Sequence, residues 1–150
     1  MSLASWKKEF YPTAAGSKAA KAAPAAHSLQ KWLGLLPANL KKHGVVQWRG
    51  DVMNAEAFSD WQGSGGVYYN MPPSFEFSGT TCSLCAKYMT SRSYDGACSA
   101  CPLYTLLDRR TCEEEDADGR PGPFSQLIFN NKPDPMIKLL KKLAKKEAKK

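Results

Sequence analysis

Four cysteines in two closely spaced pairs constrain this 150-residue chain more than any other feature. Cys82 and Cys85 form one Cys-x-x-Cys pair, and Cys98 and Cys101 form a second pair after an interval of twelve residues. A Cys-x-x-Cys turn presents two sulfurs on one side of a tight bend, so two such turns supply the four thiolates of a tetrahedral zinc site. We therefore expect a structural Zn²⁺ bound by these four cysteines.

Cys112 makes the number of cysteines odd. It can replace one of the four ligands, remain a spare thiol, or serve as a small buried hydrophobic residue. An odd number with paired spacing favours metal binding in a reducing compartment over a disulfide framework. An iron–sulfur cluster or a redox dithiol is less favoured, because the spacing differs from common iron–sulfur motifs and no βαβ pattern surrounds the pairs.

The residues around the cysteines predict how the two pairs are presented. Residues 75–77 are typical of a short strand that leads into the first pair. Asp95 and Gly96 favour a sharp reversal before the second pair, and Pro102 suits the first turn of a helix. This order predicts a treble-clef-like or zinc-ribbon-like zinc-knuckle region over residues 67–133. The predicted fold class is α+β, with amphipathic helices and few short strands around the zinc-stabilised half.

The first part of the chain divides into a basic arm and a helical segment. Residues 1–26 are rich in Ala and Lys, and residues 13–26 lack large apolar side chains, so we expect a tether there. Over residues 27–62, Ser28 is the expected N-cap of a helix with Leu29, Trp32, Leu33 and Leu36 on one face. A second helical turn should end at Gly44, and residues 45–48 and 67–69 are expected as strands, with a short helix over 54–61.

Residues 134–150 predict a basic amphipathic helix. Asp134 and Pro135 are suited to its start, while Met136 and the leucines that follow form one apolar face. The opposite face is almost entirely lysine, with Glu147 as the one acid in the run. The apolar face is expected to dock on the protein, and the lysine face is available to a polyanion.

The charge is concentrated at the two ends of the chain. Residues 1–50 carry eight Lys or Arg against one Glu, and residues 126–150 carry eight Lys against two acids, whereas residues 51–80 carry four acids and no Lys or Arg. Basic ends attract nucleic acid or an acidic protein. Aromatic residues near the first lysines can stack on bases or dock on the protein itself. The candidate nucleic-acid or partner-binding residues are Trp6, Lys7, Lys8, Lys138, Lys141, Lys142, Lys145 and Lys146.

A catalytic role is the less favoured interpretation. Four cysteines close the zinc shell, whereas a catalytic zinc keeps an open position. Neither His27 nor His43 belongs to an H-x-E or H-E-x-x-H motif, and both are interpreted as helix-end residues. We expect no enzyme, no small-molecule substrate, and neither a transmembrane span nor a secretory leader.

Several segments together are similar to a group of small cysteine-rich proteins from bacteriophage and prophage genomes. The similarity spans most of the chain and implies a zinc site and a phage or bacterial-cytoplasm origin, with no assigned activity. A fifth cysteine after the second pair recurs in that pattern, as Cys112 does here. The segments that carry the resemblance are residues 6–12, 27–32, 39–44, 82–85, 98–104 and 133–137.

These observations favour a non-enzymatic, phage-type, zinc-stabilised binding module that contacts nucleic acid through its basic ends. One alternative is a factor that binds a host protein of replication, transcription or defence. Another is a structural protein associated with the virion, and a zinc-dependent enzyme is less favoured. The expected location is the cytoplasm of the bacterial host cell, or the virion.

Overall fold

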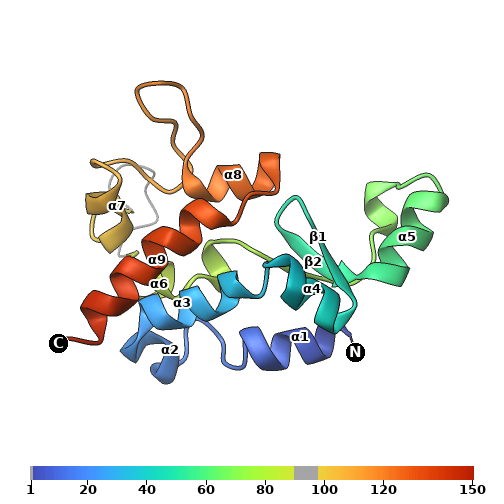
Figure 1. Ribbon diagram of the computed structural model, residues 1–150, viewed down its shortest axis with the longest axis horizontal. Helices are drawn as coiled ribbons and strands as arrows, with labels where there is room; N and C mark the ends of the chain where they lie inside the picture. Colours follow the sequence, from blue (N-terminus) through green and yellow to red (C-terminus); the bar gives the residue numbers. More distant parts are fainter. Residues whose placement is uncertain (1, 90–97) are drawn as a thin grey trace.

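Helices predominate in the computed structural model, which describes residues 2–89 and 98–150 (Figure 1). A three-stranded antiparallel sheet accompanies them, so the predicted α+β class is confirmed at this level. The elements are α1 (Leu3–Phe10), α2 (Lys18–Ala22), α3 (Pro24–Leu33), α4 (Pro37–His43), β1 (Val45–Trp48), β2 (Asp51–Asn54), α5 (Ala55–Gly63), the 3₁₀ turn η1 (Tyr68–Asn70), β3 (Ser74–Glu76), the 3₁₀ turn η2 (Gly79–Thr81), α6 (Ser83–Tyr88), α7 (Pro102–Leu106), α8 (Pro123–Asn130) and α9 (Asp134–Glu147).

The sheet has the strand order β1-β2-β3 and is a simple antiparallel meander. Val46 lies opposite Met53, and Val52 lies opposite Phe75, so apolar side chains of adjacent strands are paired. The strand predicted at residues 45–48 is confirmed. The strand predicted at residues 67–69 is wrong, because residues 68–70 form a 3₁₀ turn with exposed tyrosines.

Helix α3 lies at the centre of the helical layer, between α9 on one side and α1 on the other (Figure 1). It starts at Pro24, four residues before the predicted N-cap Ser28, because proline at the first helical position already has the required φ. Ser28 is therefore a buried residue within the helix. Helix α4 ends as predicted, with Gly44 in the left-handed conformation at φ 62°.

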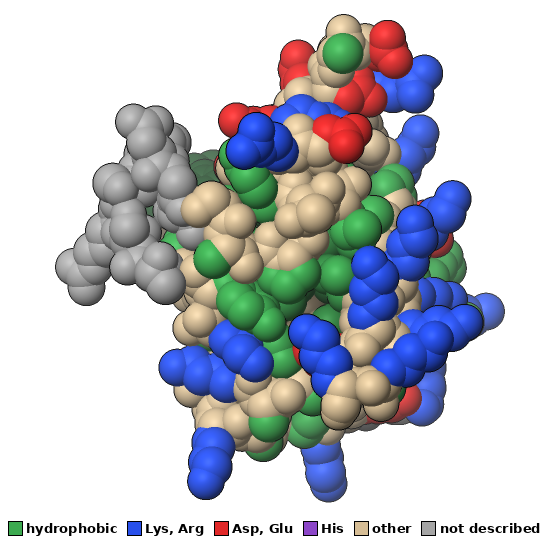
Figure 2. Space-filling view, turned by 90° about the vertical axis from the view of Figure 1, so that its left-hand side faces the viewer, with side chains coloured by type: hydrophobic (Ala, Val, Ile, Leu, Met, Phe, Trp, Pro, Cys, Tyr) green, Lys and Arg blue, Asp and Glu red, His purple; other side chains and the backbone are tan. Residues whose placement is uncertain are grey.

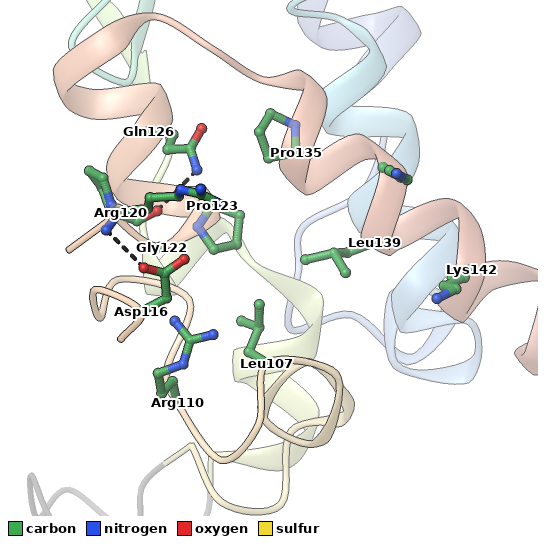
Figure 3. A pocket seen from close by; sticks show the side chains of 12 residues that line it. Leu107, Arg110, Asp116, Arg120, Gly122, Pro123, Gln126, Pro135, Leu139 and Lys142 are labelled. Carbon is green, nitrogen blue, oxygen red and sulfur yellow. Dashed lines mark hydrogen bonds between the residues drawn. The ribbon is translucent and has the colours of Figure 1, made fainter. Parts of the chain in front are cut away.

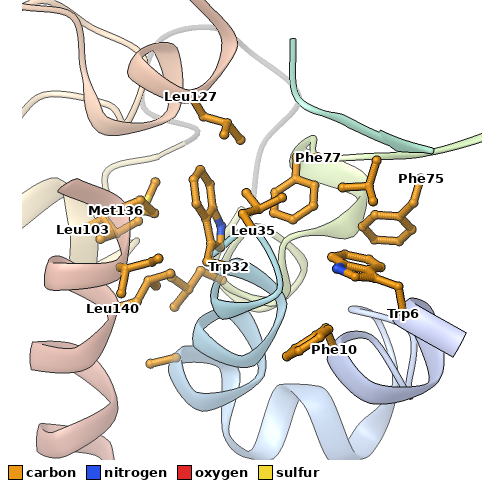
Figure 4. Packing of buried hydrophobic residues seen from close by; sticks show 14 of the residues in the cluster. Trp6, Phe10, Trp32, Leu35, Phe75, Phe77, Leu103, Leu127, Met136 and Leu140 are labelled. Atoms are coloured by element: carbon orange, nitrogen blue, oxygen red, sulfur yellow. The ribbon is translucent and has the colours of Figure 1, made fainter. Parts of the chain in front are cut away.

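The predicted N-terminal tether is wrong. Helices α1 and α2 lie in this part of the chain. Ala15 and Ala20 are also buried, although each contributes only a methyl group to the buried surface. Trp6 is completely buried, and its Nε1–H donates a hydrogen bond to the carbonyl oxygen of Gly34 at 2.9 Å. The aromatic cluster thus docks on the chain's own body, and the arm belongs to the core (Figure 4).

One apolar core runs from Trp6 in α1 to Leu143 in α9. Trp32 of α3 lies within it between the aromatic residues around Phe77 and the side chains of α9 (Figure 4). Leu84 of α6 and Leu103 of α7, next to the cysteine pairs, belong to the same core. Helix α6, which carries the first cysteine pair, packs on α2 and α3, and α7, which follows the second pair, packs on α9.

Helix α9 matches the predicted amphipathic helix. Its buried residues are Met136, Ile137, Leu140 and Leu143, and its lysines are exposed. Helix α8 had no counterpart among the sequence-based expectations, and it packs beside α9. None of the described helices is both long and apolar enough to cross a bilayer.

Candidate metal centre and basic groove

The two cysteine pairs lie next to the starts of two short helices. Cys82 is the residue before α6, and Cys85 is within its first turn. Cys101 precedes α7 and donates its backbone N–H to the carbonyl oxygen of Cys98 at 3.0 Å. The first pair is thus carried by a helix, and β3 ends before η2 rather than leading directly into a knuckle. The reversal predicted at Asp95 and Gly96 lies outside the described residues.

All five cysteines line a single cavity of about 660 Å³. Segments that are far apart in sequence form its walls, namely α3, the η2–α6 region, α7, the loop after α7, and α9. Cys112 belongs to this loop, where its carbonyl oxygen accepts a hydrogen bond from the backbone N–H of Phe124 at 2.8 Å. The structure therefore gathers the four predicted ligands and the fifth cysteine around one space. The other lining residues include Ser28, Lys31, Trp32, Leu103, Tyr104, Met136 and Leu140.

The cavity has the donor chemistry of a thiolate metal site. Among residues 2–89 and 98–150, no three Cys, His, Asp or Glu side chains converge closely enough to hold a metal ion directly. The five thiols are distributed around the cavity walls instead. Soft sulfur donors in this number select zinc or similar thiophilic metals, so the residues present suit such an ion.

Cys82 and Cys85 interact as a pair. A hydrogen bond from the Cys85 thiol holds the pKa of Cys82 well below its usual value, and the Lys31 ammonium acts in the same direction. The same interaction raises the pKa of Cys85. The two thiols are therefore coupled, and their interaction favours a thiolate at Cys82 over one at Cys85. A thiolate is the form that binds a metal ion.

Burial acts in the opposite direction on the other thiols. It raises the pKa of Cys101 to about 11 and that of Cys112 to about 12, and it also raises the pKa of Cys98. Burial destabilises an isolated thiolate because the charge loses its hydration. A bound cation reverses this preference, because it neutralises the thiolates that it coordinates.

Lys31 brings a buried positive charge to the wall of the cysteine cavity. Its side chain is 1% exposed, and its Nζ donates hydrogen bonds to the carbonyl oxygen of Thr81 at 2.7 Å and to Thr81 Oγ1 at 3.3 Å. The ammonium also lies 4.8 Å from the ring centroid of Phe77. Within the described part of the chain, no carboxylate lies within ion-pair distance of this ammonium.

Burial lowers the pKa of Lys31 to about 8, and the nearby cysteines oppose this effect. A buried ammonium is costly unless an anion compensates it. The cysteines whose negative charge would stabilise the Lys31 ammonium are Cys82, Cys85 and Cys112. Lys31 was not among the residues predicted for this site. The one sequence feature that indicated its burial is its position directly before Trp32, on the apolar side of a helix.

A hydroxyl network supports the first cysteine pair. Ser28 Oγ lies 2.8 Å from Ser83 Oγ and 3.8 Å from Cys82 Sγ. Ser83 Oγ in turn donates to the carbonyl oxygen of Pro24 at 2.6 Å. The network ties the start of α6 to α3 and orients Cys82 toward the cavity. Such outer contacts hold metal ligands in place.

The predicted partner-binding residues separate into buried and exposed groups. Trp6 is buried, so its ring cannot stack on a base in this fold. Lys7 and Lys8 are exposed on α1, and Lys7 Nζ lies 5.8 Å from the ring centroid of Phe75. On one face of the molecule, Lys and Arg side chains surround an apolar area, and acidic side chains gather at the projecting end (Figure 2). The exposed lysines of α9 are Lys138, Lys141, Lys142, Lys145 and Lys146.

Two of these lysines line a second cavity, of about 450 Å³, between α9 and the loop that joins α7 to α8 (Figure 3). Lys138 and Lys142 lie one helical turn apart on α9, and Arg110 and Arg120 belong to the loop. We call this cavity the basic groove. Its other lining residues are Leu107, Asp116, Pro121, Gly122, Pro123, Gln126, Pro135 and Leu139.

Ser5, His43 and Glu9 are hydrogen-bonded in the order of a hydrolase triad and connect α1 to α4. His43 Nδ1 lies 2.8 Å from Ser5 Oγ, and His43 Nε2 lies 2.7 Å from Glu9 Oε2. A nucleophilic serine must give its proton to the histidine. Ser5 Oγ instead donates to the carbonyl oxygen of Ser2 at 2.8 Å and accepts from its N–H, as part of the capping box of α1. His43, the last residue of α4, thus links this helix to α1.

In comparisons with known proteins, no family model, curated sequence or solved structure matches the chain.

Proposed function

We propose that this chain is a non-enzymatic, zinc-stabilised binding module of phage type that contacts nucleic acid through the exposed lysines of α9 and α1. The observation that supports it most is the gathering of five thiols and a buried, carboxylate-free Lys31 around one cavity. A four-thiolate zinc centre carries a net negative charge, and a nearby ammonium lowers its cost in a buried site. Bound zinc would act there as a structural cross-link.

The ligand set is proposed to be Cys82, Cys85, Cys98 and Cys101, with Cys112 as the possible substitute for one of them. In this arrangement the second pair enters α7 as in treble-clef-like sites. Zinc would then connect α6 to α7 across the cavity. Binding energies of structural zinc are ~10 kcal/mol or more in small domains, so the metal would contribute strongly to folding of this half.

Metal content and folding test this centre. Native mass spectrometry of protein expressed with zinc should find one zinc ion per chain, and a chelator should lower the thermal midpoint and release the ion. Cys82→Ser should lose both zinc and the raised midpoint. Comparing Cys98→Ser with Cys112→Ser identifies the fourth ligand, because only the variant that removes a ligand loses zinc. A zinc-free protein with unchanged stability would contradict the proposal.

For nucleic acid, the support is the row of exposed lysines on α9, which follows one side of a helix whose apolar side is buried. Phosphate contacts release counterions, so affinity for a single-stranded oligonucleotide should fall steeply between ~50 and 200 mM salt. Two charge-reversal pairs, Lys138→Glu with Lys142→Glu and Lys141→Glu with Lys145→Glu, should each weaken binding to a similar extent. A flat salt response would overturn this part of the proposal.

A further inference from the structure

The basic groove carries more positive charge than its own walls neutralise. In the described part of the chain, four cationic side chains line it, Arg110 and Arg120 from the loop and Lys138 and Lys142 from α9, against one carboxylate, that of Asp116 (Figure 3). The cations come from two opposite walls, so a ligand within the groove is contacted from both sides. An anionic ligand fits this distribution.

The one carboxylate in the groove is already engaged by the loop. Asp116 Oδ1 accepts hydrogen bonds from the backbone N–H groups of Asp118 and Arg120, each at 2.9 Å. These bonds lower the pKa of Asp116, which stays ionised and shapes the turn. Lys138 and Lys142 have no carboxylate within ion-pair distance in the described part of the chain. Their charges are available to a ligand.

Most of the remaining surface of the groove is apolar, and Gln126 adds one amide. Leu107 and Leu139 face each other across it, and Pro121, Pro123 and Pro135 form much of the rest (Figure 3). Proline has a fixed φ, so these walls are held in shape before a ligand binds. Among the described residues, no aromatic side chain lines the groove, whereas sequence-tolerant binding of single-stranded nucleic acid relies on aromatic stacking. The groove therefore suits an apolar side chain next to acidic ones.

We propose that the basic groove binds an acidic segment of a partner protein. One apolar side chain of the segment contacts Leu107 and Leu139, and its Asp or Glu carboxylates pair with Arg110, Arg120, Lys138 and Lys142. The volume of about 450 Å³ is in the range of small-ligand sites and accommodates a short stretch of side chains. This site goes beyond the proposed nucleic-acid contact, because it binds a different class of ligand and selects two lysines from the row on α9.

A random peptide library displayed on beads tests the proposal. It is selected on the full-length protein purified with zinc and counter-selected on the groove variant, Lys138→Glu with Lys142→Glu. Enriched peptides should place Asp or Glu beside Leu, Ile or Phe. A synthetic peptide of the enriched sequence should bind the groove variant at least about tenfold more weakly than the unmodified protein, as expected when buried charge pairs are reversed.

The matched control is Lys141→Glu with Lys145→Glu, which makes the same change in net charge on exposed lysines of the same helix that do not line the groove. It should bind the peptide within about twofold of the unmodified protein, because exposed charges outside the contact contribute little. Thermal unfolding of both variants verifies that they are folded. No enrichment, enrichment without acidic residues, or equal weakening by both variants would overturn the proposal.

An oligonucleotide arm separates this site from the proposed nucleic-acid contact. Both variant pairs should weaken oligonucleotide binding to a similar extent, because all four lysines belong to the exposed row. Only the groove pair, Lys138→Glu with Lys142→Glu, should weaken peptide binding. If oligonucleotide affinity does not depend on salt while the peptide still distinguishes the groove variant from the control variant, the nucleic-acid contact is overturned and the groove proposal stands. Oligonucleotide binding that is lost in the groove variant alone, together with no enrichment of acidic peptides, would show that the groove is a nucleic-acid site and overturn the peptide proposal.

Discussion

Glu147, at the end of α9, caps the start of α3 through Ala25. Its Oε1 accepts the backbone N–H of Ala25 and its Oε2 accepts that of Ala26, both at 3.1 Å. The residue before α3, Ala23, has no side chain able to cap the helix. A carboxylate more than a hundred residues away in sequence therefore satisfies two free N–H groups and the positive end of the helix dipole.

Replacing this carboxylate should loosen the contact between the two helices. Glu147→Ala is expected to lower the free energy of unfolding by about 1 kcal/mol, the usual cost of losing a helix cap. Denaturant unfolding measures the change. Glu115→Ala is the control, because Glu115 is exposed in the loop after α7 and should leave the free energy of unfolding unchanged within error. Equal stability of the two variants would contradict the capping role.

Gly34 allows α1 to lie directly on the end of α3. A Cβ at this position would lie 2.7 Å from Phe10 Cγ and 2.7 Å from Trp6 Cζ2, while the backbone of Gly34 is ordinary right-handed helix. Gly34→Ala should therefore cost about 1–3 kcal/mol through overpacking. Gly63→Ala, at a helical position with nothing within 4 Å of the new Cβ, should be neutral or stabilising. A neutral Gly34→Ala would mean that α1 does not pack as described.

Lys31 should affect zinc binding and apo-protein stability in opposite directions. Lys31→Met removes the counter-charge of the thiolates, so zinc affinity should fall about tenfold, the usual lower limit for an outer-shell change at a metal site. Without zinc, the variant should be as stable as the unmodified protein or more stable, because an apolar side chain replaces a buried ammonium whose desolvation is costly. Competition with a chelator and thermal unfolding measure the two effects. Exposed Lys41→Met is the control, and the same zinc affinity in all three proteins would contradict the role.

The Glu9 carboxylate should make stability sensitive to acid. Hydrogen bonds from Lys42 and His43 hold the pKa of Glu9 below its usual value of 4.5, so the folded state favours the ionised form. This contribution is fully present above pH 4.5 and is lost as the pH falls through the lowered pKa of the folded protein. Glu9→Gln should be less stable near neutral pH and show a smaller decrease on acidification. Parallel pH profiles of the two proteins would contradict the link between α1 and α4.

Local signals predicted the elements that depend on neighbouring residues. Gly44 ends α4, Pro102 starts α7, and the leucine spacing of α9 identifies the side that is buried. The Cys-x-x-Cys spacing predicted which residues surround one site, and all of them line the same cavity. Each signal acts within one or two helical turns, so each can be read from a short stretch of sequence.

The wrong predictions concern residues whose burial depends on contacts with residues distant in sequence. The alanine-rich stretch after Pro12 was expected to stay unfolded because it has little surface to bury, yet Ala15 and Ala20 are buried against the rest of the protein. Trp6 was a candidate for base stacking, and the space beside Gly34 makes it a core residue. Alanine favours the helix, and an alanine-rich helix can pack closely against a neighbouring surface because its side chains are small.

Sequence alone was enough to predict the end of α4, the start of α7, the apolar face of α9, the charged ends of the chain and the residues that supply sulfur. Only the tertiary structure decided that Lys31 is buried beside the thiols, that Glu147 caps α3, and that Lys138 and Lys142 face the loop arginines across a groove. The physical reason is that electrostatic and packing partners are set by distance in space, and α3, α9 and the loop after α7 become neighbours only when the common core forms.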